Sequence, residues 1–341
     1  MIDGIEYIWV KTPLYSSSKS FGRIWNMIYF ALKLSTFKKV PSSHIILSSP
    51  SLFPVKVAQK LSLKFHTKFL FEVRDIWPLT LVELSNISKN NPLIRWMKYY
   101  ERFAYKYADK VISLLPSAKE YYVSEGMHQD KFMYLSNGIE VKNEETKALP
   151  ESIVSRIPKD KFIVAYSGTV GIANNLDYLV QVAESIKDET DIHFIILGQG
   201  GEKKRLQKKV ASLELKNFTF LEPVDKEQVG TFLEYIDVAF ISLLPEKLFR
   251  FGVSPNKVFE YMYAKKPIVW AIEAGNNLVE EAQCGISVPL NDIEKLKESI
   301  FKLRGLSEKK REELGQNGYN FVNTHHSYDM LAEQLIKIIE E

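Results

Sequence analysis

The chain has 341 residues, about twice the usual size of one domain, so its length predicts two domains with separate cores. Hydrophobic residues make up 45% of the chain and charged residues 26%, which excludes a disordered or collagen-like protein. The single cysteine, Cys284, excludes an internal disulfide and a cysteine-built zinc site, and the histidines have no metal-ligand spacing. We therefore expect no bound metal and a reducing, cytoplasmic location.

The net charge of +3 is unevenly distributed. Residues 1–150 hold 21 basic and 13 acidic side chains, a net +8, whereas the remainder holds 24 and 29, a net −5. The basic excess suits an anionic partner such as membrane headgroups, a phosphorylated substrate or nucleic acid, and chance bias on a solvated surface explains it equally well. No apolar run is long enough to span a membrane, and residues 1–4 lack the pattern of a signal peptide, so we expect no export by these routes.

In the first half, β-rich runs alternate with helical stretches, which predicts βαβ units and a parallel sheet. The expected strands are Ile5–Val10, His44–Ser48, Lys68–Glu72, Lys110–Leu114 and Phe132–Leu135.

Two of the predicted helices in this half are rich in aromatic and basic residues. Residues Phe21–Phe37, with Lys38 and Lys39 beside them, and the helix Leu93–Ala108 fit either a membrane interface or ordinary packing on the sheet. The following segment, Lys142–Pro158, has the composition of a linker, and we place the domain boundary at Pro150.

The second half restarts the alternation. The expected strands are Phe162–Ser167, His193–Leu197, Phe218–Leu221, Val238–Ser242, Pro267–Ala271 and Ile286–Val288. The expected helices between them are Leu176–Ile186, Glu202–Leu213, Lys226–Glu234, Asn256–Tyr263 and Asn277–Ala282. Six strands with five crossovers form a complete doubly wound domain, whose ligands bind at the carboxyl ends of the strands. The site is therefore expected in the loops after Ser167, Leu197, Leu221 and Ser242.

Two of these loops are rich in glycine. The first contains Gly168, Thr169 and Gly171 before a helix whose first turn is expected to include Asn174 and Asn175. The second contains Gly198, Gly200 and Gly201. Small residues there let backbone N–H groups and a helix N-terminus approach a phosphate, although a plain tight turn has the same sequence.

The segment Arg250–Val269 predicts a helix that begins at the strand ends. Ser254 is a typical N-cap and Pro255 suits the first helical position. Lys257 and Glu260 share one face of this helix and could hold a diphosphate and a ribose diol, or form an ordinary exposed ion pair.

The chain resembles the family 4 retaining glycosyltransferases of the GT-B fold, in particular bacterial members that build O-antigen and capsule. The resemblance covers nearly the whole chain and implies two Rossmann-like α/β domains that face each other across a cleft. The motifs that carry it are Phe71–Pro78, Ser136–Ile139, Tyr166–Gly171, Pro255–Met262 and Lys266–Val269. The resemblance implies an acceptor-binding domain at residues 1–150 and a nucleotide-sugar-binding domain at 151–341, with the last helix packing back on the first domain.

The resemblance also implies roles for residues of the second domain. Glu260 matches the second glutamate of the family's Glu-x7-Glu motif, near the donor ribose, and Gly252 stands where the first glutamate is usual. Backbone N–H groups of Gly252, Val253 and Ser254 would then contact the sugar. The family's usual basic pair is absent, because Thr169 follows Gly168 and Asn174 stands near the usual lysine. The diphosphate would rest on Lys257, Arg250 and amides of the loops and of the helix start at Asn256.

Two further motifs match the first domain and the crossover. Arg74 and Asp75 follow a strand where relatives carry a histidine and an acidic residue near the acceptor. Asp75 could accept the acceptor's proton while Arg74 fixes its geometry, or the two could form a buried structural pair. Asn137 and Gly138 resemble the family's hinge turn.

Compared with the family, we expect roughly 50 to 60 residues of a doubly wound domain to be missing at the start of the chain. The function implied is transfer of a hexosyl or N-acetylhexosaminyl group from a UDP-sugar to a lipid-linked saccharide at the inner membrane face, with no cofactor, metal or nucleic acid. The alternatives are a nucleotide-sugar 2-epimerase of the same architecture and a truncated remnant without activity.

Overall fold

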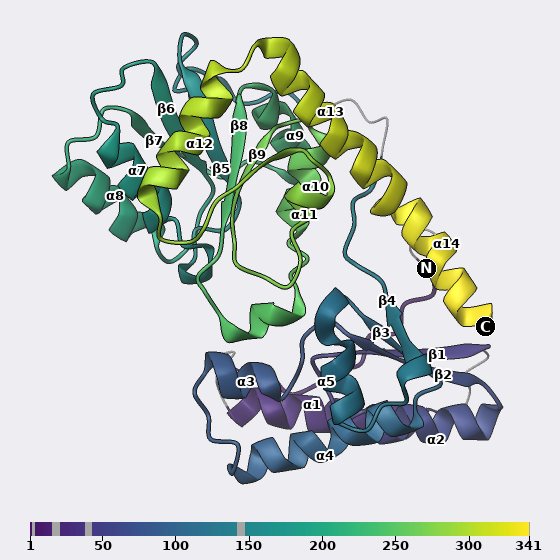
Figure 1. The fold of residues 1–341 in the computed structure, drawn as a ribbon. Helices are drawn as coiled ribbons and strands as arrows, with labels where there is room; N and C mark the ends of the chain where they lie inside the picture. Colours follow the sequence, from purple (N-terminus) through teal and green to yellow (C-terminus); the bar gives the residue numbers. More distant parts are fainter. Residues whose placement is uncertain (2–3, 16–20, 38–42, 142–146, 341) are drawn as a thin grey trace. The chain divides into compact units, whose positions relative to one another are not determined.

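The computed structural model describes residues 1, 4–15, 21–37, 43–141 and 147–340. The chain folds into two compact units. Unit 1 comprises Met1–Leu135 together with Leu335–Glu341, and unit 2 comprises Ser136–Gln334. Each unit contains its own parallel sheet (Figure 1), as the length and the alternation of elements predict.

Unit 1 is built on a four-stranded parallel sheet whose strands follow one another in chain order. The strands are β1 (His44–Ser48), β2 (Lys68–Val73), β3 (Lys110–Ser113) and β4 (Phe132–Tyr134). Its helices are α1 (Phe21–Leu34), α2 (Val55–Phe65), α3 (Leu79–Leu84), α4 (Pro92–Tyr107) and α5 (Lys119–Ser124), with the 3₁₀ turns η1 (Pro116–Ala118) and η2 (Gln129–Lys131). The four strands predicted from His44 onward are thereby confirmed to within a residue or two.

The predicted strand Ile5–Val10 is wrong. Only Ile5 forms a β-bridge, and residues 6–15 are irregular. Trp9 is 85% exposed and Leu14 is 99% exposed, so the alternating apolar side chains of this segment do not face a core. A strand needs a hydrogen-bonded neighbour, and among the described residues β1 pairs only with β2.

The two faces of the unit 1 sheet bury different elements. Phe71 of β2 contacts Tyr105 of α4, whose ring centroid lies 6.1 Å away. On the other face Leu70 and Ile112 pack against Ile338, from the last turns of α14 (Tyr328–Glu340). The buried side chains of α4 show that this helix packs on the sheet, the second of the two interpretations that its sequence allows.

Unit 2 is a six-stranded parallel sheet with the order β10-β9-β8-β5-β6-β7. Its strands are β5 (Phe162–Ser167), β6 (Ile192–Leu197), β7 (Phe218–Leu221), β8 (Val238–Ser242), β9 (Ile268–Ala271) and β10 (Gly285–Ser287). The strand order reverses between β5 and β8, so unit 2 is doubly wound as predicted, and its switch point lies where ligands of such sheets bind.

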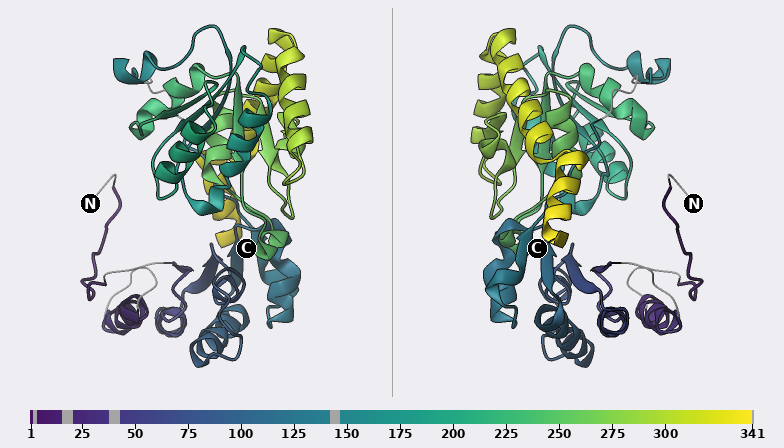
Figure 2. Two further views of the ribbon diagram at one scale, coloured as in Figure 1. Left: turned by 90° about the vertical axis from the view of Figure 1, so that its left-hand side faces the viewer. Right: turned by 90° about the vertical axis from the view of Figure 1, so that its right-hand side faces the viewer.

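Helices cover both faces of this sheet (Figure 2). The helices are α6 (Glu151–Val154), α7 (Asp177–Ser185), α8 (Lys203–Ser212), α9 (Lys226–Glu234), α10 (Asn256–Tyr263), α11 (Leu278–Glu281), α12 (Ile293–Gly305) and α13 (Glu308–His325), with the 3₁₀ turns η3 (Ile172–Asn174) and η4 (Lys247–Phe251). One core contains side chains of α7, α8 and α12, and the other contains side chains of α9, α10, α11 and α13. The long apolar strands are buried on both faces, as parallel sheets require.

The boundary between the units lies between Leu135 and Ser136, earlier in the chain than the predicted boundary at Pro150. Ile139 already belongs to unit 2, because it forms a parallel bridge with Ser327. A β-carbon on Gly138 would lie 2.2 Å from the carbonyl oxygen of His326, so only glycine fits this crossing. The predicted linker contains α6, and its residues 142–146 lie outside the described part of the chain.

Candidate donor site at the carboxyl edge of unit 2

Two glycine loops meet at the carboxyl edge of the unit 2 sheet. Gly168, after β5, has φ +138°, and Gly198, after β6, has φ +144°. A β-carbon on Gly198 would lie 1.9 Å from the carbonyl oxygen of Gly168. The N–H of Gly168 donates to Leu197, and the N–H of Val170 donates to Gln199. Glycine is therefore required here for the close approach of two backbones, which the sequence motif alone could not distinguish from a phosphate loop.

The helix predicted at Leu176–Ile186 is confirmed to within a residue, but Asn174 and Asn175 precede its first turn and are not part of it. Asn174 ends the 3₁₀ turn η3, Asn175 is left-handed, and α7 starts at Asp177. The Asp177 carboxylate pairs with Arg205 and Lys209 of α8. The first turn of α7 thus holds a carboxylate of the chain itself, which is neutralised by two cations of α8.

The polar groups of the first loop are directed toward one lysine. Lys257 Nζ donates to the hydroxyl of Tyr166 at 3.0 Å and to Oδ1 of Asn174 at 2.9 Å, and it lies 4.9 Å from the Tyr166 ring centroid. The Tyr166 hydroxyl and the Asn174 amide both donate to the carbonyl oxygen of Thr169. Gly171 precedes η3 as its N-cap residue, and a β-carbon on Gly168 would lie 3.2 Å from Lys257 Cε. The structure therefore brings Lys257, Gly168 and Thr169 together, as the sequence analysis predicts.

Burial shifts the pKa of both charged groups on α10. It lowers the pKa of Lys257 to about 8, an effect that the Glu260 carboxylate opposes. It raises the pKa of Glu260, and Lys226 and Lys257 oppose that shift. Neither side chain is exposed. Among the described residues, Lys257 and Glu260 do not form an ion pair with each other. The alternative of an ordinary exposed ion pair is therefore wrong. The Lys257 ammonium is held by neutral acceptors instead.

Glu260 lines a cavity of 570 Å³ between α9 and α10. Its walls include Gly138, Lys226, Gly230, Asn256 and Tyr328. The cavity combines a carboxylate, an ammonium and aromatic and aliphatic walls, which are the groups that bind a nucleoside.

The turn before α10 differs from its prediction. The helix begins at Asn256 with Pro255 at the N-cap position, and Ser254 does not cap it. The Ser254 hydroxyl accepts the backbone N–H of Asn137 at 3.0 Å. The N–H of Gly252 donates to Phe249, and the N–H of Val253 donates to Asn276 Oδ1 at 2.8 Å.

These bonds occupy two of the three N–H groups that the resemblance assigned to the sugar. Gly252 and Val253 shape the turn, and only the Ser254 amide remains among the three as a candidate sugar contact. Arg250 is exposed at the end of η4, with its guanidinium 4.1 Å from the Phe251 ring centroid. Neither Tyr166 nor Asn276 stands out individually in the sequence. Asn276 follows β9, and the rule that ligands bind at carboxyl strand ends would have included that loop.

In unit 1, Arg74 and Asp75 lie just beyond the carboxyl end of β2. Their backbone N–H groups donate to Ser49 Oγ at 2.8 and 3.1 Å. Both side chains are exposed, and Arg74 Nη1 lies 4.0 Å from a carboxylate oxygen of Glu72. The alternative of a buried Arg–Asp pair is therefore wrong, and the two side chains are available to a ligand of unit 1.

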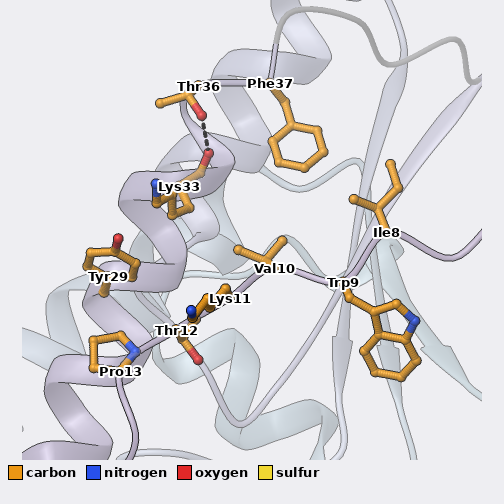
Figure 3. Close-up of a pocket in the computed structure, with 10 residues that line it drawn as sticks. All are labelled: Ile8, Trp9, Val10, Lys11, Thr12, Pro13, Tyr29, Lys33, Thr36 and Phe37. Carbon is orange, nitrogen blue, oxygen red and sulfur yellow. Dashed lines mark hydrogen bonds between the residues drawn. The ribbon is translucent and has the colours of Figure 1, made fainter.

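Unit 1 also contains a hollow, formed by residues 8–13 and by α1 with the residues just after it (Figure 3). It measures 500 Å³, and Lys11 and Lys33 are among its basic residues. Trp25 and Leu32 of α1 are 55% and 57% exposed, and Ala31 is the buried residue of this helix among the described side chains. Most other described side chains of α1 are half-buried, so one side of the helix packs on unit 1 while Trp25 and Leu32 face outward, which fits both interpretations of its sequence. No helix in the described ranges is both long enough and apolar enough to cross a bilayer.

Comparison with known proteins identifies relatives of both halves. The sequence profile of the family described as Glycosyl transferases group 1 matches residues 150–321, just over half of the chain. An Escherichia coli (strain K12) protein named as a colanic acid biosynthesis glycosyl transferase, WcaI, is 22% identical over 266 residues. That match covers 72% of this chain and 65% of the relative, so the chain spans less than two thirds of that protein.

Solved structures show the same fold. Anabaena Alr3699/HepE, in complex with UDP, has a TM-score of 0.69 at 15% identity, covering 94% of this chain and 83% of the other. An E. coli structure described as trehalose-6-phosphate bound with UDP-2-fluoro glucose has a TM-score of 0.73 at 11% identity, covering 94% of this chain and 78% of the other. The two α/β units, each with a parallel β-sheet, have the GT-B fold, as the resemblance implied.

Proposed function

Because the chain belongs to the group 1 glycosyl transferases, we propose that it transfers a sugar from a UDP-sugar with retention of configuration and without a metal ion. The transferred group is a hexose or N-acetylhexosamine, and the acceptor is a lipid-linked saccharide of surface polysaccharide such as O-antigen or capsule. The name of the E. coli relative supports the polysaccharide context, and the UDP bound to the Anabaena protein supports the donor.

One observation carries the donor side of this proposal. Lys257 Nζ is held at the carboxyl edge of the sheet by two neutral oxygens, so its charge is not neutralised by a carboxylate within hydrogen-bonding distance. An ammonium in this state is suited to bind a diphosphate, and the amides at the start of α10 add partial positive charge. The cavity beside Glu260 would hold the nucleoside, with the carboxylate accepting hydrogen bonds from the ribose hydroxyls.

The reaction would use these groups without a covalent enzyme intermediate. The bond between the sugar C1 and the diphosphate oxygen breaks while a bond forms from C1 to the acceptor oxygen on the same face. Lys257 and the nearby amides stabilise the charge that develops on the departing diphosphate. Asp75 accepts the proton of the acceptor hydroxyl, and Arg74 fixes the acceptor's geometry.

The exposed aromatic residues of unit 1 support a place at the cytoplasmic face of the membrane. Trp9, Leu14, Trp25 and Leu32 are exposed, and Trp9 lines the same hollow as Lys11 and Lys33. Exposed apolar and basic side chains together suit an anionic lipid interface. Flotation with phosphatidylglycerol vesicles would test this. The native protein is expected to bind the vesicles, and the double variant Trp9→Ser, Trp25→Ser is expected not to bind them. Unchanged binding of the double variant would contradict the membrane proposal.

The activity is tested by incubating the protein with UDP-sugars and a bacterial lipid extract. Transfer of label to lipid is expected, and Lys257→Ala and Glu260→Ala are each expected to lower turnover at least about tenfold. Unchanged rates in both variants contradict the assignment of the site. Formation of an epimer from the UDP-sugar alone would indicate a 2-epimerase instead. Binding of UDP without any transfer would indicate a non-catalytic protein.

A further inference from the structure

The turn that leads into α10 is held by two asparagines from distant parts of unit 2. Asn276 Oδ1 accepts the N–H of Val253 at 2.8 Å, and Asn276 Nδ2 donates to the carbonyl oxygen of Val253 at 3.1 Å. Asn137 donates its backbone N–H to Ser254 Oγ at 3.0 Å and its Nδ2 to the Ser254 carbonyl oxygen at 2.8 Å. Asn276 therefore binds the N–H and the carbonyl oxygen of Val253, and Asn137 binds the hydroxyl and the carbonyl oxygen of Ser254.

The turn needs such support because its own sequence supplies little. Gly252 has φ +105°, a conformation open to few other residues, and α10 begins without a side-chain cap. The Asn276 loop is also pressed against the turn, because a β-carbon on Gly275 would lie 2.2 Å from the carbonyl oxygen of Arg250. The direction of α10 is thus set by groups outside the helix.

Lys257 and Glu260, the two residues of α10 on which the proposed function depends, come directly after this turn in the chain. Lys257 lies three residues after Ser254, and its Nζ reaches Tyr166 and Asn174 across the neighbouring loop. Those distances leave little tolerance, since a hydrogen bond weakens steeply as its geometry degrades. A shift of the turn would move Lys257 away from both oxygens.

We propose that Asn276 and Asn137 are positioning residues that aim the start of α10, and with it Lys257, at the diphosphate of the donor. This rests on the proposed function, in which Lys257 binds that diphosphate. Asn276 contributes two side-chain hydrogen bonds and Asn137 one, so Asn276 has the larger effect.

The neighbouring residue provides a matched control. Asn277 has the same side chain and is also half-buried, but it accepts the N–H of Glu280 at the start of α11 and donates to Ser287. Asn277→Ala therefore removes an asparagine with two hydrogen bonds from the same loop without touching Val253 or Ser254.

The test compares Asn276→Ala, Asn137→Ala and Asn277→Ala by calorimetric titration with UDP. Asn276→Ala is expected to weaken UDP binding between about tenfold and a hundredfold, Asn137→Ala less, and Asn277→Ala by less than about twofold. Thermal melting of each variant shows whether it is folded. Equal UDP affinity of the Asn276 and Asn277 variants would overturn the proposal.

A second readout requires no nucleotide, so it distinguishes failure of this inference from failure of the proposed function. In the native protein, brief acetylation at pH 10, where Lys257 is neutral and exposed lysines are partly neutral as well, is read by mass spectrometry. It is expected to modify Lys257 slowly, because access to this half-buried, hydrogen-bonded amine limits the rate. Asn276→Ala is expected to speed this modification severalfold, and Asn277→Ala to leave it unchanged. If the native protein binds no UDP, the proposed function fails. If Lys257 is protected equally in all variants, the positioning role fails.

Discussion

The carboxyl end of β2 in unit 1 and the start of α10 in unit 2 hold their charged residues in opposite ways. Arg74 and Asp75 are exposed, and they are fixed by backbone bonds to Ser49. Lys257 and Glu260 are half-buried, and burial shifts the pKa of each. Under the proposed function, unit 2 holds its charged groups in place before the ligand binds, whereas Arg74 in unit 1 has only a loose contact with Glu72 at 4.0 Å and would gain closer partners from a ligand.

The largest expected effect is that of a substitution in unit 1, at the exposed pair of this comparison. Asp75→Ala should lower kcat by about a hundredfold or more, because a positioned proton acceptor contributes at least that much to a transfer. UDP binding, measured by calorimetry, should remain as in the native protein. Asp130→Ala, another exposed aspartate of unit 1, is the control. An Asp75 variant with the native kcat would contradict its role as the base.

On the unit 2 side, Lys257→Met should weaken UDP binding by about tenfold to a hundredfold through loss of a charge-assisted contact. The pH dependence sharpens this prediction. The pKa of Lys257 is about 8, so the fraction carrying the charge falls as the pH rises through that value. UDP affinity should therefore decrease between pH 7 and 9, and the decrease should be absent in the methionine variant. Lys208→Ala, on the exposed surface of α8, should behave as the native protein.

The close packing of the glycine loops predicts a smaller effect, on stability. Gly198→Ala places a β-carbon against the Gly168 carbonyl at a positive φ, so it should lower the free energy of unfolding by more than about 1 kcal/mol. Gly201→Ala is the control, because no atom lies within 4 Å of its added β-carbon. If the denaturant unfolding curves of the two variants coincide, the loops relax to accommodate the added β-carbon, and the prediction is wrong.

The smallest expected effect concerns a buried acid of unit 1. Glu101 of α4 is fully buried, pairs with Lys98 at 2.8 Å and accepts the Tyr121 hydroxyl at 3.0 Å. Burial raises its pKa to about 7. The folded state therefore binds this proton more tightly than the unfolded chain, so its contribution to stability is greatest below pH 4.5 and is lost as the pH rises through 7. Glu101→Gln should flatten the change of the melting temperature between pH 5 and 7.5, and an unchanged slope would contradict this.

The elements of unit 2 could be predicted from sequence because its strands are continuous apolar runs separated by glycine and polar loops. β5, β7, β8, α9 and α10 have the predicted bounds. Apolar alternation failed at Ile5–Val10, because whether such a run becomes a strand depends on a neighbour that the sequence does not reveal.

The site could be predicted only in part. Lys257 was identified because motif and helix periodicity place it at a strand end, and the structure adds its partners Tyr166 and Asn174. Contacts between residues more than 80 positions apart, such as Asn137 with Ser254, depend on loop geometry that local propensity does not encode. The capping role given to Ser254 failed for the same reason, because a tertiary partner took its hydroxyl.

The last turns of α14 have a consequence for biosynthesis. Ile338 completes the core that Leu70 and Ile112 begin, and Lys68 donates to the Ile339 carbonyl at 3.0 Å. These residues emerge from the ribosome only after the whole of unit 2. The apolar side chains of the four-stranded sheet that Ile338 covers therefore lack this cover while the intervening chain is synthesised, and such exposed apolar surface favours aggregation of a nascent chain.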